Sequence, residues 1–214
     1  MHIAIVTLEG FNELDSLIAY GMLSRIALLG DASWQVSIAS PQPRVRSMNG
    51  LVLDAHADLS VLPSADAVLV GSGMHTRQWA QDPALKAQLQ LDPERQLIGA
   101  QCSGTLLLAQ LGYLHHAPVS TDLTTRPWVQ ESGVQVSDQP FMVHGNVATA
   151  GGCLASHYLA AWVITRLRGA AAAREVLYYF APVGEKDIYV ERAWSHIASH
   201  VSSGASTGPI STLV

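Results

Sequence analysis

The hydrophobic positions of this chain form short apolar runs that alternate with longer stretches of helical periodicity. Runs such as residues 2–8 and 67–70 are continuous, which is typical of strands buried on both faces of a parallel sheet. The predicted strands are residues 2–8, 34–39, 67–70, 97–100, 134–136, 141–143 and 147–149, with a short strand or turn at 118–121 and a hairpin turn at 49–50. The predicted helices are residues 14–29, 82–89, 103–112, 128–132, 153–167 and 170–179. This alternation predicts an α/β fold, a single-domain sandwich with a mainly parallel central sheet and helices on both faces.

The carboxyl ends of the predicted strands are where a functional site is expected. In open parallel sheets, ligands bind beyond these ends, in loops that several strands bring to one edge. Three loops meet that condition: residues 10–15 after the first strand, residues 71–74 after the third, and the corner at Cys102. The sequence therefore predicts that these three loops form one site.

Cys102 stands at a sharp turn from a strand into a helix. The apolar run 97–100 ends just before it, and Ser103, Gly104 and Thr105 open an apolar helix that stops at Gly112. Gly104 permits the close packing that such a turn needs, and a helix N-terminus stabilises a thiolate. A free cysteine is often only a small buried hydrophobe. The strand–Cys–Ser–Gly–helix context instead favours a nucleophile.

Composition and charge narrow the classes of function. The chain has 214 residues, 49% of them hydrophobic, a net charge of −5 and two cysteines. No basic run indicates nucleic acid, no apolar run is long enough to span a membrane, and the chain begins directly with a strand. We expect a cytoplasmic protein that acts on a small molecule and uses neither nucleic acid nor membrane. Its domain should span residues 1–201, with residues 202–214, rich in Ser, Gly and Thr, as a loose tail.

Four segments, in their order along the chain, resemble one known family. They are Glu9 to Asp15, which ends in Leu-Asp; Val70-Gly71-Ser72-Gly73; Cys102-Ser103-Gly104; and residues 145–152, Gly-Asn-Val-Ala-Thr-Ala-Gly-Gly. Together they resemble the DJ-1/PfpI superfamily, from His2 to about Pro182. The resemblance implies the flavodoxin-like fold of the class I glutamine amidotransferases and a homodimer. The segment 145–152 looks most like the isocyanide hydratase and AraC-associated branches.

The resemblance also implies roles for individual residues. Cys102 takes the position of the nucleophile, and Asp15 takes that of the family's acidic residue. The backbone amides of Gly73 and Ser103 would stabilise developing negative charge. Ser72 and Asp122 would contact the substrate. No cofactor and no metal ion are implied.

Departures from the family pattern limit the function. Ser103 stands where the family's peptidases and many other members have histidine, which argues against a peptidase, and isocyanide hydratases have threonine there. Asp122 stands where many relatives have histidine, Gly71 replaces the usual proline, and Ala100-Gln101 alters a glycine-rich segment. No helix–turn–helix domain follows, so an AraC-type regulator is not implied.

Two functions remain open. One is an enzyme most like an isocyanide hydratase, in which the Cys102 thiolate attacks a small electrophilic carbon and water then releases the product. The other is a redox or ligand-sensing protein that uses an oxidisable Cys102.

The roles of other candidate residues also have structural alternatives. Asp15 could serve only as the N-cap of the helix that follows. Cys153, with His157 one turn later, is a second candidate nucleophile, which we interpret as core packing. The pairs His115-His116 and His196 with His200 lack a third ligand and are interpreted as surface or capping residues.

Overall fold

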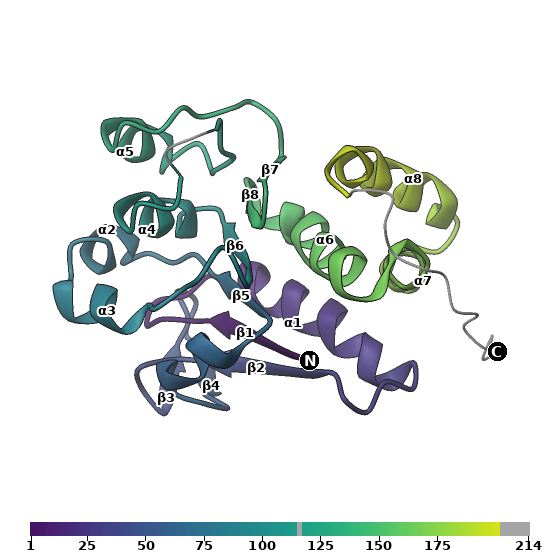
Figure 1. Ribbon diagram of the computed structural model, residues 1–214, viewed down its shortest axis with the longest axis horizontal. Helices are drawn as coiled ribbons and strands as arrows, with labels where there is room; N and C mark the ends of the chain where they lie inside the picture. The colour runs from purple at the N-terminus through teal and green to yellow at the C-terminus, as the bar shows by residue number, and fades with distance from the viewer. Residues whose placement is uncertain (115–116, 202–214) are drawn as a thin grey trace.

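A computed structural model describes residues 1–114 and 117–201. The predicted tail and the pair His115-His116 lie outside these ranges. The central sheet has six strands in the order β2-β1-β5-β6-β8-β7 (Figure 1). The strands are β1 (His2–Val6), β2 (Gln35–Ala39), β5 (Ala67–Val70), β6 (Leu97–Gln101), β7 (Phe141–His144) and β8 (Val147–Ala150). All neighbours are parallel except β7 and β8, which form an antiparallel edge.

Helices cover both faces of the sheet (Figure 1). One face packs against α1 (Glu13–Leu28) and α6 (Ser156–Arg168), with α7 (Ala170–Phe180) and α8 (Lys186–Ile197) beside them. The other face packs against η1 (Leu59–Ser64), α3 (Pro83–Gln88), α4 (Gly104–Gln110) and α5 (Arg126–Glu131). The sandwich predicted from the hydrophobic pattern is thereby confirmed.

Alternation along β1 explains why two separate cores form. Ile3 and Ile5 belong to the core under α1 and α6, whereas Ala4 and Val6 belong to the core under α4. Successive side chains of a strand point to opposite faces, so a fully apolar strand supplies both cores at once. None of the described helices is long and apolar enough to cross a membrane.

Several predicted elements differ from the structure. The predicted strand 134–136 does not join the main sheet. It forms a single bridge, between Val136 and Val119 of the segment 118–121, which was predicted as a short strand or turn. The expected helix 153–167 begins with a short 3-10 turn, η2 (Cys153–Ala155), before α6 starts. The short helix α2 (Thr76–Trp79), η1 and α8 were not predicted. The sequences of α2 and α8 mix polar and apolar residues without a side-chain N-cap, whereas η1 has one in Asp58, which was overlooked.

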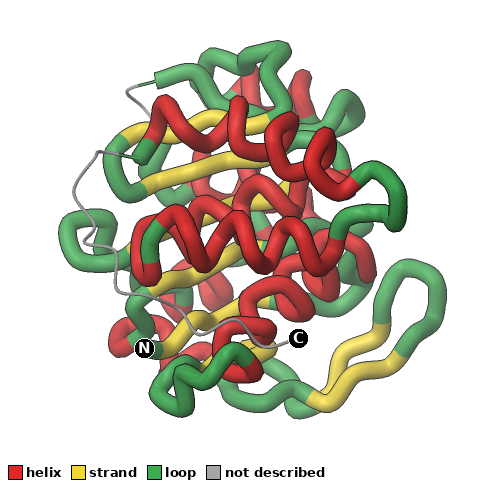
Figure 2. The backbone as a smooth tube through the Cα atoms, turned by 90° about the vertical axis from the view of Figure 1, so that its right-hand side faces the viewer, coloured by secondary structure: helices red, strands yellow, loops and turns green. Residues whose placement is uncertain are grey.

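The predicted hairpin turn at Asn49-Gly50 joins β3 (Arg44–Arg46) to β4 (Val52–Asp54). These two strands form a separate antiparallel ribbon that projects from the body of the molecule (Figure 2). The turn is tied back to α1, because the Asn49 side chain donates to Glu13 Oε2 at 2.8 Å and the Ser47 hydroxyl donates to Glu13 Oε1. The bond from Ser47 is the main cause that lowers the pKa of the Glu13 carboxyl.

Candidate active site

Cys102 occupies the corner between β6 and α4 in a left-handed backbone conformation. Its φ is +48°, and within residues 1–114 and 117–201 no other non-glycine residue has a positive φ. Its N–H donates to the Ala150 carbonyl at 2.7 Å, and its carbonyl accepts from Thr121 Oγ1 at 2.8 Å. A conformation that costs free energy is held here by bonds on both sides, as is common where a nucleophile must be presented.

Gly104 makes the corner sterically possible. A Cβ at this position would lie 2.6 Å from the Val70 carbonyl oxygen and 2.8 Å from that of Gly71. Both atoms belong to the end of β5 and its loop, which cannot retreat as a flexible side chain could. The start of α4 therefore packs directly on the neighbouring strand.

We expect Gly104→Ala to lower the free energy of unfolding by about 3 kcal/mol or more, because the added methyl group meets two backbone carbonyls. Urea denaturation measures this. Gly21→Ala is the matched control. Gly21 lies inside α1, and an added Cβ would make only ordinary contacts of 3.6 Å with the Phe180 ring. That variant should be neutral or slightly stabilised. Equal stability of the two variants would contradict the packing argument.

Asp15 lies in the first turn of α1 with only 2% of its surface exposed. The Ser72 hydroxyl donates to its Oδ2, while its Oδ1 is buried without a hydrogen-bond partner. Asp15 is not the N-cap, which corrects that interpretation. Asn12 is the N-cap, and its Oδ1 accepts from the Leu14 amide at 3.1 Å. A buried carboxyl that does not cap its helix is free to act on its neighbours.

Cys153 lies beside Asp15 and Cys102. A carboxylate oxygen of Asp15 and the two sulfur atoms all lie within 4.8 Å of one another. Cys153 is partly exposed at the start of η2, and Asn12 Nδ2 donates to its sulfur at 3.2 Å. The interpretation of Cys153 as core packing is therefore wrong, and we call these three residues the Asp15–Cys102–Cys153 cluster.

His157, which the sequence places one helical turn after Cys153, is hydrogen-bonded elsewhere. Its Nδ1 is hydrogen-bonded to the Leu154 carbonyl, and its ring lies against Tyr158.

Among the described residues, the Asp15–Cys102–Cys153 cluster is the one group of three or more His, Cys, Asp and Glu side chains whose ligand atoms are close enough to hold a metal ion. Two thiolates and a carboxylate would suit a soft cation such as Zn²⁺ or Cu(I).

Burial controls the protonation of the cluster. Burial raises the pKa of the Asp15 carboxyl, although the hydrogen bond from Ser72 opposes it. Burial, followed by the charge of Asp15, raises the pKa of the Cys102 thiol, and the same two causes raise that of Cys153. The sequence predicted a thiolate stabilised by a helix N-terminus, but α4 has only seven residues and burial dominates. A charge on Asp15 disfavours a charge on the Cys102 sulfur, so the two groups titrate as a pair.

Ser103 connects the corner to the loop after β5. Its Oγ accepts from the Gly73 amide at 3.2 Å and shares a hydrogen bond of 2.7 Å with Thr76 Oγ1. The Gly73 N–H, which the resemblance assigns to an oxyanion hole, is thus engaged by a side chain of the elbow itself. A substrate oxyanion would have to take that amide from Ser103.

Asp122 lines the same cleft as Cys102, and its carboxylate is hydrogen-bonded within its own turn. Its Oδ1 accepts from the amides of Thr124 and Thr125, both at 2.9 Å, and so leads the chain into α5. It does not take over the role of the family's histidine as a partner of the thiol. The groups that shift the pKa of Cys102 most are Asp15, Cys153 and Gln101, whose side-chain amide donates to the sulfur at 3.4 Å.

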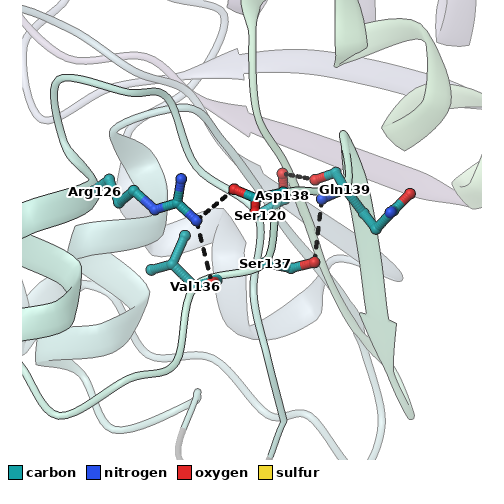
Figure 3. Close-up of polar contacts among 6 residues, drawn as sticks. All are labelled: Ser120, Arg126, Val136, Ser137, Asp138 and Gln139. Atoms are coloured by element: carbon teal, nitrogen blue, oxygen red, sulfur yellow. Dashed lines mark hydrogen bonds and ion pairs between the residues drawn. The ribbon is translucent and has the colours of Figure 1, made fainter.

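The segment that carries Asp122 is held in place by polar contacts at its two ends (Figure 3). Arg126 donates to Asp138 Oδ1 at 2.6 Å, and Ser120 Oγ donates to the Gln139 carbonyl at 2.8 Å. These bonds join residues 120–126 to residues 138–139, which lie just before β7. Together with the bond from the Ser120 amide to Thr149 Oγ1 of β8 at 2.8 Å, they fix one wall of the site.

A cleft of about 440 Å³ opens above the cluster, and we call it the Cys102 cleft. Cys102, Cys153 and Ser103 line it together with Ser72, Gly73 and Asp122. The rest of the lining comprises Asn12, Met48, Met74, Thr76, Arg77, Gln78, Thr124, Thr125 and Trp128. The structure therefore brings together every residue that the sequence singled out for this site, since Asp15, which does not line the cleft, lies buried beside the two cysteines. Asn12 was overlooked, although its position before a helical pattern marks it as an N-cap.

A nucleophile elbow with a buried acid, set in an α/β sandwich with a mainly parallel sheet, defines a class of cysteine-centred proteins. The chain belongs to the DJ-1/PfpI family, whose family model matches residues 1–166. No curated protein sequence matches the chain significantly.

Solved structures share the fold at low sequence identity. DJ-1 from Schizosaccharomyces pombe is 15% identical with a TM-score of 0.72, over 85% of this chain and 100% of that one. A cysteine-to-alanine mutant of the DJ-1 superfamily protein STM1931 from Salmonella typhimurium is 22% identical with a TM-score of 0.72, over 85% and 98%. A ThiJ/PfpI family protein from Pseudomonas syringae is 18% identical with a TM-score of 0.70, over 92% and 87%.

Proposed function

We propose that this protein is an enzyme that uses Cys102 to add water to a small electrophilic carbon, most like an isocyanide hydratase. The observation that carries the proposal is the buried carboxyl of Asp15 beside the Cys102 sulfur at the base of the Cys102 cleft. This pair can hold one proton and one negative charge next to a substrate. An isocyanide carbon needs both a nucleophile and a proton at the same atom.

The chemistry follows from the proton that the pair shares. The Cys102 thiolate attacks the terminal carbon of the isocyanide, and Asp15 delivers its proton to that carbon, which gives a thioimidate. Asp15, now a carboxylate, takes a proton from the attacking water and passes it to the nitrogen. The tetrahedral adduct then expels the thiolate, and its hydroxyl proton returns to Asp15. The net reaction converts an isocyanide and water into an N-substituted formamide, and the pair is regenerated.

The size and lining of the cleft support a small substrate. Met48, Met74 and Trp128 offer apolar surface to the cleft, while Ser72, Ser103 and Thr76 offer hydroxyl groups. Apolar walls with a few polar groups at the reacting end are typical of small-molecule sites. Ser103 also occupies the position where the resemblance places threonine in isocyanide hydratases.

The test is turnover of aryl and alkyl isocyanides, with formamide measured by chromatography. The proposal requires many product molecules for each protein molecule. Formation of a stoichiometric Cys102 adduct or oxidation product without turnover would refute it and would favour the redox or ligand-sensing function.

Limiting iodoacetamide at neutral pH should modify Cys102 before Cys153, because Asp15 can hold the proton while the Cys102 sulfur holds the charge. Cys153 is the more exposed of the two thiols. Preferential labelling of Cys102 would therefore reflect the higher reactivity of its thiol and not easier access for the reagent. Peptide mapping measures the ratio, and preferential labelling of Cys153 would contradict the assignment of the nucleophile.

We further propose a homodimer, as the resemblance implies. Leu14, Leu154 and Met74 are large apolar side chains that lie at or next to the cleft-lining segments, and they are 49%, 69% and 62% exposed. A second copy would remove such surface from water. Light scattering at micromolar concentration should give twice the mass of the chain, and the mass of one chain would refute the dimer.

A further inference from the structure

Cys153 has no role in the proposed reaction, although its sulfur is adjacent to that of Cys102. We propose that Cys153 is a resolving cysteine: after a hydroperoxide oxidises Cys102, Cys153 condenses with it to form a reversible intramolecular disulfide. The inference rests on the nucleophilic role of Cys102 proposed above, and it is independent of the substrate.

The two sulfur atoms start close enough for this reaction. They lie within 4.8 Å of one another, and a disulfide needs about 2.05 Å between them. The chain itself brings them together, since the Cys102 amide bonds to the Ala150 carbonyl where β8 ends and Cys153 follows directly after Gly151 and Gly152. The approach is thus a property of the sheet register and not of a flexible tail.

Cys153 is the partner that can move. Cys102 is fixed by backbone hydrogen bonds to Ala150 and Thr121. Cys153, by contrast, begins the short turn η2 at the edge of the cleft and is partly exposed. It follows Gly152, whose φ is +89°. A Cβ added at Gly152 would have no neighbouring atom within 4 Å, so there is free space around this residue. Closing the remaining gap therefore requires a local adjustment of η2 rather than of the elbow.

The neighbours of Cys153 suit the chemistry of resolution. Asn12 Nδ2 donates to its sulfur at 3.2 Å and would stabilise negative charge that develops there during attack. The Asp15 carboxyl lies within the same cluster and can give a proton to a leaving group. An ordinary thiol packed in a core would have neither of these partners.

The reaction balances in two steps. In the first, the Cys102 thiolate attacks the hydroperoxide, the O–O bond breaks, the leaving alkoxide or hydroxide takes the Asp15 proton, and Cys102 becomes a sulfenic acid. In the second, the Cys153 thiol gives its proton to the Asp15 carboxylate and its sulfur attacks that of Cys102. The S–O bond breaks, and hydroxide leaves with this proton as water. Two thiols lose two hydrogen atoms and the hydroperoxide is reduced. The disulfide protects Cys102 from irreversible oxidation to a sulfinic acid.

The test uses the full chain as wild type and as the Cys153→Ser and Cys153→Ala variants, treated with hydrogen peroxide in the presence of a chelator. The chelator removes any metal ion that the cluster could hold. Intact mass and non-reducing peptide mapping should show that wild type loses two hydrogen atoms, joins Cys102 to Cys153 within one chain, and is restored by dithiothreitol. Both variants should instead add two oxygen atoms at Cys102, and dithiothreitol should not restore them. Circular dichroism checks that the variants fold, and the pair of substitutions guards against one that does not.

Two outcomes would overturn the proposal. In one, wild type accumulates Cys102 sulfinic acid while Cys153 stays reduced. In the other, the disulfide joins two chains. Either result leaves the isocyanide reaction untouched, because turnover is measured on the reduced protein. Conversely, a disulfide formed by a protein without turnover would refute the proposed function and keep this inference.

Discussion

Replacing Cys102 with serine should lower formamide production by about ten-thousandfold or more, because a serine hydroxyl is a far weaker nucleophile than the thiolate that attacks the substrate carbon. Serine keeps the size of the side chain, and the backbone bonds of residue 102 to Ala150 and Thr121 do not involve the sulfur. The fold should therefore survive. Initial rates with a saturating isocyanide measure the loss, and thermal unfolding checks the structure.

Cys153→Ser is the matched control for this experiment. It removes a thiol of the same cluster that forms no bond to the substrate in the proposed reaction. Its turnover should exceed that of Cys102→Ser by a wide margin. If the two variants lose turnover equally, or if Cys102→Ser retains activity within about tenfold of wild type, Cys102 is not the nucleophile.

Asp15→Asn should have opposite effects on catalysis and on stability. Turnover should fall by about a hundredfold or more, since the amide cannot exchange the proton that the reaction moves between carbon, water and nitrogen. Stability at neutral pH should rise, because burial raises the pKa of the native carboxyl. The native state then binds more protons than the unfolded state above the unfolded pKa of about 3.9, and wild type loses stability as pH rises. The variant lacks this loss.

The measurement is urea unfolding of wild type and Asp15→Asn from about pH 4 to pH 7, together with rates at pH 7. Asp82→Asn serves as the control, because Asp82 caps α3 through its Oδ1 and asparagine retains that acceptor. It should change neither turnover nor the pH dependence of stability. An Asp15→Asn protein with unchanged turnover would leave Asp15 with only a structural role.

The parts of the fold that sequence reasoning captured are those in which local chemistry decides the structure. The buried strands β1, β5 and β6 are apolar on both faces, so their run lengths predict them directly. The corner at Cys102 is predicted by neighbouring residues too, because a glycine and an apolar helical run follow directly after a buried strand. Parallel strands then bring their carboxyl ends to one edge, which places the loops of Asp15 and Gly73 beside the thiol.

The misinterpreted parts depend on long-range placement. Cys153 follows two glycines and precedes an apolar helix, a pattern that looks like packing until the pairing of β6 with β8 places it beside Cys102. The pKa of Cys102 is a second case, because the helix start is visible in the sequence but the burial that outweighs it is not. Hydrogen bonding of the Gly73 amide to Ser103 likewise depends on how two loops meet.

The hairpin formed by β3 and β4 allows the substrate specificity of this protein to change while its reacting groups stay the same. Met48 reaches the Cys102 cleft from the turn of that hairpin, whereas the cluster stands on β6, α1 and η2. Glu13 anchors the turn through Ser47 and Asn49 and takes no part in the cluster. Insertions or substitutions at the hairpin tip can therefore reshape the entrance for new molecules while natural selection preserves the reacting groups beneath. In laboratory evolution, Met48 is the place to diversify first, because it lines the cleft and its side chain does not anchor the turn.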